Sequence, residues 1–350
     1  MSFTIAFYIH HHGSGHLMRT LQVAKAIPDY VIILIGSGLK QLENLPEHIK
    51  LIHLPMDIAD DEIETETERP VRAFHYAPLG IRGIRDRAAI LTELFRTYYP
   101  MVLVVDVSAE VSLLARLAGV PTLIIRQHGN RTDLPHQLAY DSAEKLIAPY
   151  PASMYRGEKD EMYNKTVFTG GFSRFDGQQE SEKTIPLRVC ILVGAGGSSI
   201  TETFLRHLAA SCSDFEFHVL GLKQSTGMEQ SNLHFHGQLN DPLILLQTAD
   251  IIIGNTGHNT VMEVASLNKS FIGIPENRPF DEQLEKALSI LRRSGIEVIL
   301  PGDLMNVNWS EQLHQLRKTE VDWSGVIDPS AIAIMADTII KTGEKFFYKH

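Results

Sequence analysis

A histidine that follows two glycines near the N-terminus has the chemistry of a base. Gly13-Ser14-Gly15-His16 comes shortly after the apolar stretch 3–9, which predicts a strand. Glycines in such a loop let the backbone approach a ligand closely, and ligands gather at the carboxyl ends of parallel strands. An imidazole titrates near neutral pH and can take a proton from a hydroxyl group. His16 is therefore a candidate general base, and a loop histidine without a role is the alternative.

A carboxylate occupies a comparable place further along the chain. Asp106 directly follows the apolar run 101–105 and precedes a predicted helix at 109–117. A carboxylate that binds the far nitrogen of a catalytic imidazole fixes its tautomer and stabilises the imidazolium that forms. Asp106 could orient His16 in this way, or it could simply cap the helix that follows.

A strand–turn–helix pattern at 251–263 has the features of a phosphate site. Three isoleucines run into a glycine-containing turn that opens directly into a helix. The free N–H groups and the positive dipole end of such a helix suit an anion. Glu263 follows Thr260 by about one helical turn, a suitable depth for accepting hydrogen bonds from sugar hydroxyls. The glycine-rich loop 194–199 also precedes a predicted helix and could hold phosphate oxygens.

These segments resemble the donor-binding signature of GT-B glycosyltransferases. In the plant-type nucleotide-sugar transferases the pattern reads Gly-x-Asn-Ser-x-x-Glu and closes with an acidic residue and Gln. The matching positions are Gly257, Asn259, Thr260, Glu263, Glu282 and Gln283. One position departs from the pattern, because Asn255 stands where a phosphate-binding histidine is usual. The phosphate contact would then be made differently or by His258.

The N-terminal loop is similar to the Gly-x-Gly-His loop of the same enzymes, whose histidine activates the acceptor in plant-type members. Met18-Arg19 extends it toward the form in relatives of the peptidoglycan N-acetylglucosaminyltransferase. The same form occurs in the nucleotide-sugar hydrolase of pseudaminic acid synthesis. The resemblance implies inverting transfer from a nucleotide-diphosphate sugar, expected to be UDP-linked, to an acceptor hydroxyl, with His16 as base. The main alternative is a hydrolase in which His16 activates water; a 2-epimerase and a catalytically silent binding domain are further ones.

The resemblance also assigns the remaining contacts. The expected donor-binding residues are Gly15, Gly196, Gly197, Ser198, Leu239, Gly257, His258, Asn259, Thr260, Glu263, Glu282 and Gln283. His128 and Arg131 follow another predicted strand and are candidates for an acceptor or phosphate contact. We expect no metal cofactor, because His10 and His12 point opposite to His11 on an extended chain and lack further ligands at usual spacing.

The predicted elements that must position these residues alternate between strands and helices in both halves of the chain. Predicted strands cover 31–35, 51–54, 101–105 and 122–126, and then 187–193, 216–220, 251–253 and 270–274. Alternation of this kind favours parallel sheets covered by helices on both faces. With the resemblance it predicts an α/β GT-B fold of two Rossmann-like doubly wound domains facing a cleft. The expected domains are an acceptor domain at 1–170, a donor domain at 171–330 and a terminal helix at 331–350 that returns to the first.

Composition restricts the classes of function. The 350 residues are 44% hydrophobic and 21% charged, with a net charge of −10 that disfavours non-specific nucleic-acid binding. Two cysteines and the absence of a leader-like N-terminus suggest a reducing, cytoplasmic location. The acidic run 57–68 is expected to be a solvated loop. The arginine-rich segment 69–87 is either a solvated helix start or a patch for a small-molecule, glycan or lipid-linked acceptor, with peripheral contact at the inner face of a membrane.

Overall fold

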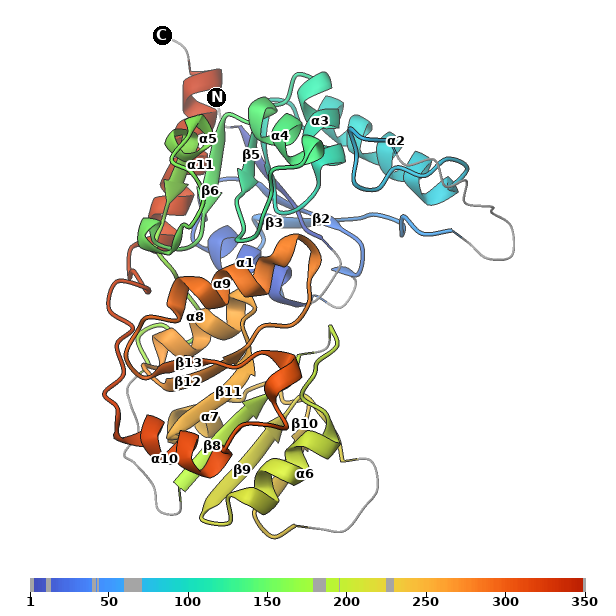
Figure 1. The fold of residues 1–350 in the computed structure, drawn as a ribbon. Helices are drawn as coiled ribbons and strands as arrows, with labels where there is room; N and C mark the ends of the chain where they lie inside the picture. The colour runs from blue at the N-terminus through green and yellow to red at the C-terminus, as the bar shows by residue number, and fades with distance from the viewer. Residues whose placement is uncertain are drawn as a thin grey trace.

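The computed structural model describes residues 3–10, 14–39, 42, 44–59, 71–178, 187–194, 196–224 and 230–348. These residues form two α/β domains stacked one above the other (Figure 1). Each domain has a twisted sheet with helices on its faces. The predicted GT-B architecture of two Rossmann-like domains is therefore confirmed.

The N-terminal domain contains seven parallel strands in the order β3-β2-β1-β4-β5-β6-β7. The strands are β1 (Thr4–Tyr8), β2 (Ile32–Gly36), β3 (Ile49–His53), β4 (Met101–Val105), β5 (Thr122–Ile125), β6 (Lys145–Ala148) and β7 (Thr166–Phe168). Its helices are α1 (Ser14–Lys25), α2 (Arg82–Thr97), α3 (Ala109–Leu117), α4 (Leu134–Ser142) and α5 (Glu161–Lys165). The order reverses between β1 and β4, which places the loops after these two strands at a topological switch point.

The C-terminal domain contains six parallel strands in the order β10-β9-β8-β11-β12-β13. The strands are β8 (Leu187–Leu192), β9 (Phe215–Leu220), β10 (Leu233–Gly237), β11 (Ile251–Asn255), β12 (Ser270–Ile274) and β13 (Ile296–Val298). Its helices are α6 (Glu202–Ser211), α7 (Leu243–Thr248), α8 (His258–Ser266), α9 (Glu282–Ile290) and α10 (Trp309–Lys318). The switch point here lies between β8 and β11, so the glycine-rich loop and the 254–260 turn are neighbours.

The central strands are apolar along their whole length because both sheet faces are covered. All five residues of β4 are buried, as are those of β2. Side chains that alternate along each strand enter two separate clusters, one on each face of the sheet. The C-terminal sheet divides its apolar side chains in the same way. Continuous apolar runs of this kind are typical of parallel sheets.

The last helix, α11 (Ala331–Phe347), returns to the N-terminal domain. Met335, Ala336 and Ile339 are buried in the cluster that contains β1 and α1. Gly343 allows this approach, because a Cβ atom there would lie 2.2 Å from the ring of Phe3. The expected return of the terminal helix is confirmed.

Several elements were not predicted, or differ from prediction. The helices α4, α5 and α10 and the strands β6, β10 and β13 are absent from the sequence expectations. Arg87 was grouped with surface arginines, but its guanidinium is buried and donates to Ser37 Oγ, Pro55 O and the Tyr8 hydroxyl. That interpretation of Arg87 was wrong, because internal oxygens accept its N–H groups and the Asp57 carboxylate lies 3.5 Å from its Nη2 atom. Within the described residues, no helix is long and apolar enough to cross a membrane.

Candidate functional site

His16 and Asp106 meet at the switch point of the N-terminal sheet. His16 lies in the first turn of α1, and Asp106 follows β4, which pairs with β1. The Nδ1 atom of His16 lies 2.5 Å from Asp106 Oδ2. Arg19, one turn further along α1, binds the other carboxylate oxygen. Residues three apart share a helix face, so α1 presents a base and a cation to the same carboxylate.

The surroundings of Asp106 keep it ionised. Burial by itself raises the pKa of this carboxyl group, but the charges of Arg19 and His16 and their hydrogen bonds outweigh burial. The resulting pKa lies well below the usual value, so the carboxylate is charged at neutral pH. The side chain of His16 is 24% exposed, whereas that of Asp106 is 4% exposed. The pair thus consists of a buried anion and an imidazole that solvent can reach.

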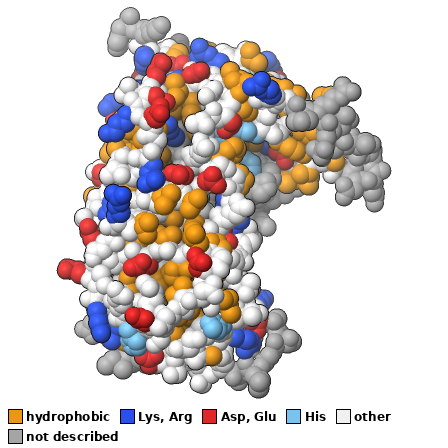
Figure 2. Space-filling view, viewed as in Figure 1, with side chains coloured by type: hydrophobic (Ala, Val, Ile, Leu, Met, Phe, Trp, Pro, Cys, Tyr) orange, Lys and Arg blue, Asp and Glu red, His pale blue; other side chains and the backbone are white. Residues whose placement is uncertain are grey.

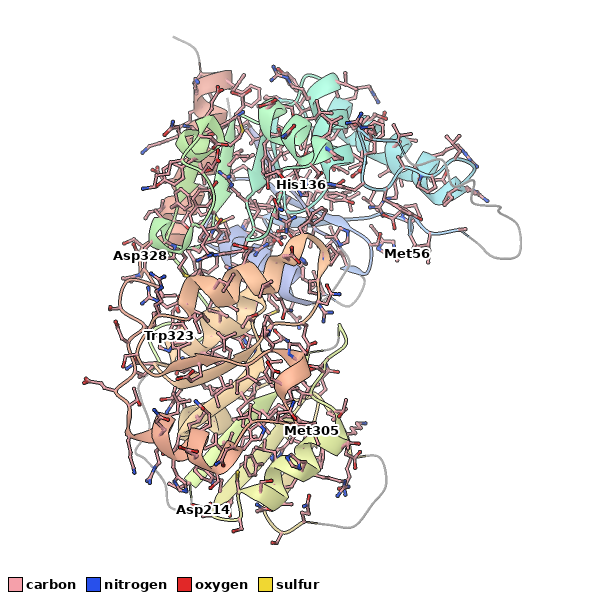
Figure 3. All side chains as sticks on the ribbon, viewed as in Figure 1. Met56, His136, Asp214, Met305, Trp323 and Asp328 are labelled. Atoms are coloured by element: carbon pink, nitrogen blue, oxygen red, sulfur yellow. The ribbon has the colours of Figure 1, made fainter. Side chains whose placement is uncertain are left out.

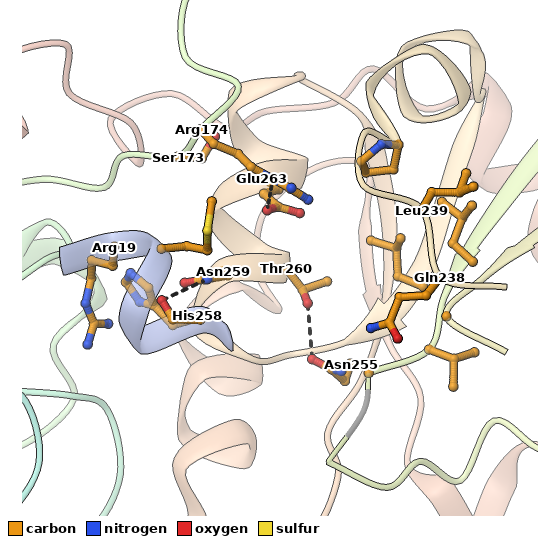
Figure 4. Close-up of a pocket in the computed structure, with 18 of the residues that line it drawn as sticks. Arg19, Ser173, Arg174, Gln238, Leu239, Asn255, His258, Asn259, Thr260 and Glu263 are labelled. Atoms are coloured by element: carbon orange, nitrogen blue, oxygen red, sulfur yellow. Dashed lines mark hydrogen bonds and ion pairs between the residues drawn. The ribbon is translucent and has the colours of Figure 1, made fainter. Parts of the chain in front are cut away.

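A pocket of about 300 Å³ lies between the domains, beside α1 (Figure 4). It is lined by the start of α1, the crossing segment 172–174, the ends of β8 and β9, the 238–239 loop and α8. The predicted donor residues on its wall are Gly15, Leu239, His258, Asn259, Thr260 and Glu263. Figure 2 shows the molecule hollowed on the side where the two domains meet.

The turn before α8 is organised by Asn255. Its Oδ1 accepts hydrogen bonds from Gly257 N at 2.9 Å and from Thr260 Oγ1 at 3.2 Å. The Nδ2 atom points toward Gly194, where a Cβ atom would come within 2.8 Å of it. The departure from the histidine of the plant-type pattern therefore gives the turn an internal acceptor and leaves an amide donor toward the glycine-rich loop.

Two residues of α8 contact other segments of the site, namely α1 and the crossing segment 172–174. Asn259 Nδ2 donates to Gly15 O at 3.3 Å, which joins α8 to α1. Glu263 Oε1 accepts from Arg174 Nε at 2.9 Å. Burial raises the pKa of Glu263, and the charge and hydrogen bond of Arg174 oppose that rise. Glu263 thus remains on the pocket wall with Arg174 beside it (Figure 4).

A carboxylate binds the groups of the glycine-rich loop that were predicted to bind phosphate. Ser198 Oγ, Ser199 Oγ and Ser199 N all donate to Glu276 Oε1, at 2.9, 2.9 and 2.7 Å. Gly197 has φ +87°, and its carbonyl accepts from Arg278 Nη2 at 2.7 Å. The lining of the pocket includes Gly194 but not the predicted residues Gly196, Gly197 and Ser198. In this structure an internal anion takes the donors that were assigned to phosphate, and their role with a ligand stays a prediction.

A buried lysine contacts the imidazole of His258. Lys286 on α9 lies with its Nζ 2.8 Å from His258 Nδ1 and 5.6 Å from the ring centre of Tyr150. Burial lowers the pKa of Lys286 to about 7; the charge of Glu282 opposes that shift and that of Arg19 adds to it. Burial first, and then the charge of Lys286, hold the pKa of His258 well below its usual value. His258 is therefore neutral at neutral pH.

His128 and Arg131 lie at the domain junction, outside the lining of the pocket beside α1. His128 is buried, with its ring 3.8 Å from that of Tyr150. Arg131 Nη2 donates to Glu282 Oε2 at 3.2 Å, and its guanidinium lies 5.1 Å from the ring of Phe280. Arg131 and Glu282 thus join the two domains, whereas His128 packs inside the N-terminal domain. The acceptor or phosphate contact of His128 and Arg131 and the sugar contact of Glu282 stay predictions.

The start of α9 is strained. Phe280 and Asp281 have φ values of 61° and 54°, in the left-handed region that non-glycine residues rarely adopt. Asn130 N donates to Phe280 O at 2.6 Å across the junction. The predicted sugar ligand Gln283 is buried here, and its Oε1 accepts from Glu276 N at 3.0 Å. Its side chain thus braces the segment between β12 and α9.

A larger pocket of about 600 Å³ opens in the N-terminal domain, next to Asp106. Its lining includes Val107 and Ser108, which directly follow Asp106, together with Tyr8 and His10. Apolar side chains from Met56, Ile84, Leu91, Val111 and Leu114 form much of the remaining wall. Met56 lies where the base of the projecting α2 region meets the hollow (Figure 3). This pocket therefore has a largely apolar wall and lies next to the loop that carries Asp106, the partner of His16.

Metal-ligating side chains near the site are occupied by protein. His75, Asp133 and His136 lie together in the N-terminal domain. Asp133 binds both imidazoles, at 2.7 Å and 2.6 Å. Arg131 Nη1 lies 3.0 Å from His136 Nε2, and a guanidinium only donates, so this nitrogen already serves as an acceptor. His11 and His12 lie outside the described residues, and nothing in the structure bears on them.

Sequence reasoning gave no role to four polar residues of the site, namely Arg19, Arg174, Glu276 and Lys286. The spacing of Arg19 from His16 was a readable signal, because it places both on one helix face. The other three come from segments that only the tertiary fold brings to the site. Their partners are 89, 77 and 28 residues away along the chain.

Comparison with known proteins agrees with this architecture. Residues 189–321 match the glycosyltransferase family 28 C-terminal domain. Over 256 residues the chain is 24% identical to a UDP-N-acetylglucosamine–N-acetylmuramyl-(pentapeptide) pyrophosphoryl-undecaprenol N-acetylglucosamine transferase of Geobacillus kaustophilus, covering 66% of this chain and 70% of that one.

Solved structures share the fold over nearly the whole chain. MurG of Acinetobacter baumannii superimposes with a TM-score of 0.62 and 16% identity, over 97% of this chain and 100% of that one. The glycotransferase of kitacinnamycin gives 0.64 and 12%, over 99% and 96%, and LpCGTa in complex with UDP gives 0.64 and 13%, over 98% and 94%. The chain is a glycosyltransferase of the GT-B fold, with a C-terminal domain of the glycosyltransferase family 28 type.

Proposed function

We propose that this protein transfers a sugar from a nucleotide-diphosphate donor to an acceptor hydroxyl with inversion, and that His16 is the general base. The observation that carries the proposal is the 2.5 Å contact between His16 Nδ1 and the buried carboxylate of Asp106, beside the interdomain pocket. A carboxylate that stays ionised holds the proton on Nδ1, so Nε2 keeps its lone pair for a substrate proton.

In the proposed reaction, the acceptor oxygen attacks the anomeric carbon while its proton passes to His16 Nε2. The bond from that carbon to the diphosphate oxygen breaks, and the nucleoside diphosphate leaves with the electron pair. A single displacement from the opposite face inverts the anomeric centre. Asp106 stabilises the imidazolium that forms, which is where a buried negative charge is most useful.

The start of α8 is the proposed binding site for the diphosphate of the donor. Helix N-termini attract anions, and this one carries His258 with Arg19 and the Asn255 amide nearby on the same pocket. When Lys286 is charged it donates to His258 Nδ1, so the proton of the neutral ring lies on Nε2 and can be donated. In the proposed complex Glu263, deeper along the helix, accepts hydrogen bonds from sugar hydroxyls.

A UDP-linked donor is favoured on two grounds. The relative from Geobacillus kaustophilus uses a UDP-sugar by name, and LpCGTa was solved in complex with UDP. In this chain, the loop Gln238–Leu239 lines the pocket beyond the ends of β8 and β9. A base held there would meet an apolar side chain and backbone groups, which suits the small uracil ring. We expect no metal to be needed, since helix termini and side chains supply the positive charge.

The second pocket supports an acceptor with an apolar part, either a small molecule or a lipid-linked one. Large apolar side chains are also exposed around its rim and on the neighbouring arm, namely Met56, Ile58, Val71, Phe74 and Leu79. Arg85 on α2 adds positive charge nearby. If the acceptor is lipid-linked, this surface would contact the cytoplasmic face of a membrane.

A panel of nucleotide sugars tests the proposal without knowledge of the acceptor. The purified protein is scanned for thermal stabilisation by UDP, GDP, TDP and CDP sugars, and free sugar is measured in parallel. Stabilisation by one nucleotide family with slow release of sugar supports a transferase and identifies its base. Rapid release of free sugar that depends on His16 would favour the hydrolase instead. Failure of every nucleotide to stabilise the protein would refute both.

A further inference from the structure

Three histidines and a glutamate gather on one face of the C-terminal sheet. Glu216 and His218 alternate along β9, while His234 and His236 alternate along β10, which is the edge strand. His218 and His234 are direct partners in the register. Asp214, just before β9, lies at the end of this domain far from the N-terminal one (Figure 3), so β9 runs toward the pocket.

The opposite face explains why these residues share a side. Phe215, Phe217 and Val219 point into the hydrophobic core beneath the sheet. With a strand period of two, the residues between them must face the other way. The core therefore does not require polar side chains on this face, and single imidazoles could form their hydrogen bonds with solvent equally well.

One nitrogen in the set lacks a hydrogen bond. His218 Nδ1 lies 2.9 Å from His236 Nε2, but His218 Nε2 is buried and has no hydrogen-bond partner among the described residues. The carboxylate oxygen Oε2 of Glu216 lies 3.8 Å from this nitrogen. When His218 donates through Nδ1, the lone pair of Nε2 faces a carboxylate, and two acceptors face each other. Such a pair is stabilised by a cation between them.

We propose that Glu216, His218 and His234 bind a divalent transition-metal ion such as Zn²⁺, with His236 as the outer acceptor of the His218 Nδ1–H group. Ligand atoms of the three residues lie within 4.8 Å of one another. Bond lengths of about 2.0–2.2 Å to nitrogen and oxygen require them to converge slightly. Two histidines and a glutamate form a known zinc ligand set, and a ligating histidine usually donates its other N–H group.

One positive charge opposes a cation at this cluster. It belongs to Arg188 on β8, the register partner of Glu216. Arg188 Nη1 donates to Thr248 Oγ1 at 2.7 Å, so a hydrogen bond holds this side chain to α7.

The proposed ion would fix the edge strand to β9 next to the base-binding loop. His236 is followed directly by Gly237 and then by Gln238–Leu239, which line the donor pocket. The site is separate from the His16–Asp106 pair, which belongs to the other domain. The proposal therefore concerns metal binding and stability, and it does not depend on the proposed transfer reaction.

Equilibrium dialysis and cobalt absorption on the full, chelator-treated chain test the site. The wild type should bind one equivalent of Zn²⁺ or Co²⁺, whereas His218→Gln and His234→Gln should bind none. Added metal should raise the melting temperature of the wild type and leave those of the two variants unchanged. His236→Phe should weaken binding about 10–100-fold, as loss of an outer-shell partner does.

His314→Gln is the matched control, because His314 is a surface histidine on α10 paired with Asp214. It should bind like the wild type, and circular dichroism checks that each variant is folded. A wild type that takes up no metal overturns the proposal. Equal uptake by the wild type and His218→Gln also overturns it, because the ion would then lie elsewhere.

Discussion

Replacing Asp106 by asparagine should damage stability and catalysis for separable reasons. The side chain of Arg19 is 6% exposed and ion-paired to Asp106. Asparagine keeps the shape but removes the charge, which leaves a guanidinium buried without a counter-ion. Breaking a buried pair in this way costs about 3–5 kcal/mol, a large part of the roughly 5–15 kcal/mol that keeps a domain folded.

The catalytic loss has a different origin and a different size. Without the carboxylate, His16 loses the partner that holds its proton on Nδ1 and stabilises the imidazolium. General-base catalysis contributes about 10²–10⁴-fold in rate. The turnover of Asp106→Asn should therefore be lower than that of the wild type by a factor in this range. Nucleotide binding should change little, because Asp106 does not line the donor pocket.

A second substitution separates the two effects. Adding Arg19→Met to Asp106→Asn removes the orphaned charge, so urea unfolding should recover much of the lost free energy while turnover stays low. Because the folded pKa of Asp106 is depressed, its contribution to stability is present above about pH 4 and is lost as the pH falls further; that acid dependence should disappear in Asp106→Asn. Unchanged stability of Asp106→Asn, or restored turnover in the double variant, would refute this reasoning.

Three further predictions concern residues around the pocket. The pKa of Lys286 in the folded protein is lowered to about 7, so above that pH the folded state binds fewer protons than the unfolded state. The free energy of unfolding of the wild type in urea should therefore rise from about pH 7 toward 10, and that of Lys286→Met should depend less on pH. Parallel profiles for the two proteins would contradict the assignment. Gly129→Ala should destabilise the domain junction by about 1–3 kcal/mol, because φ is +113° and the new Cβ would lie 2.7 Å from Phe280 O. Gly302→Ala is the control, because nothing lies within 4 Å of the Cβ position there. Equal unfolding midpoints for the two variants would contradict this prediction. Glu263→Gln should weaken nucleotide binding about 10–150-fold in calorimetry, since hydrogen bonds to charged groups contribute about 1.5–3 kcal/mol. Unchanged affinity would remove Glu263 from the donor site.

The strong periodic elements were predictable because local sequence decides them. The runs 101–105 and 270–274 are strands at the predicted residues, since a short, mostly apolar run that is buried on both faces has few other structures open to it. Short elements such as β13 and α5 have too few residues for a periodic signal. They form because neighbouring strands and helices already provide the surfaces that they cover.

The candidate site was partly predictable for topological reasons. His16 and Asp106 follow strands that pair in the sheet, so their meeting follows from the alternating pattern once β1 and β4 are adjacent. The engagement of Ser198 by Glu276 was not predictable, because the carboxylate reaches the loop from the segment after β12. Arg87 shows the same limit, since no local pattern distinguishes a buried arginine with internal acceptors from an exposed one.

The most direct test of the central claim compares turnover and nucleotide binding in His16→Ala, with His53→Ala as a surface histidine control on β3. The proposed role of His16 predicts a loss of turnover of at least about 10²-fold and a nucleotide dissociation constant close to that of the wild type. Turnover by His16→Ala equal to that of the wild type would contradict the assignment of His16 as the base.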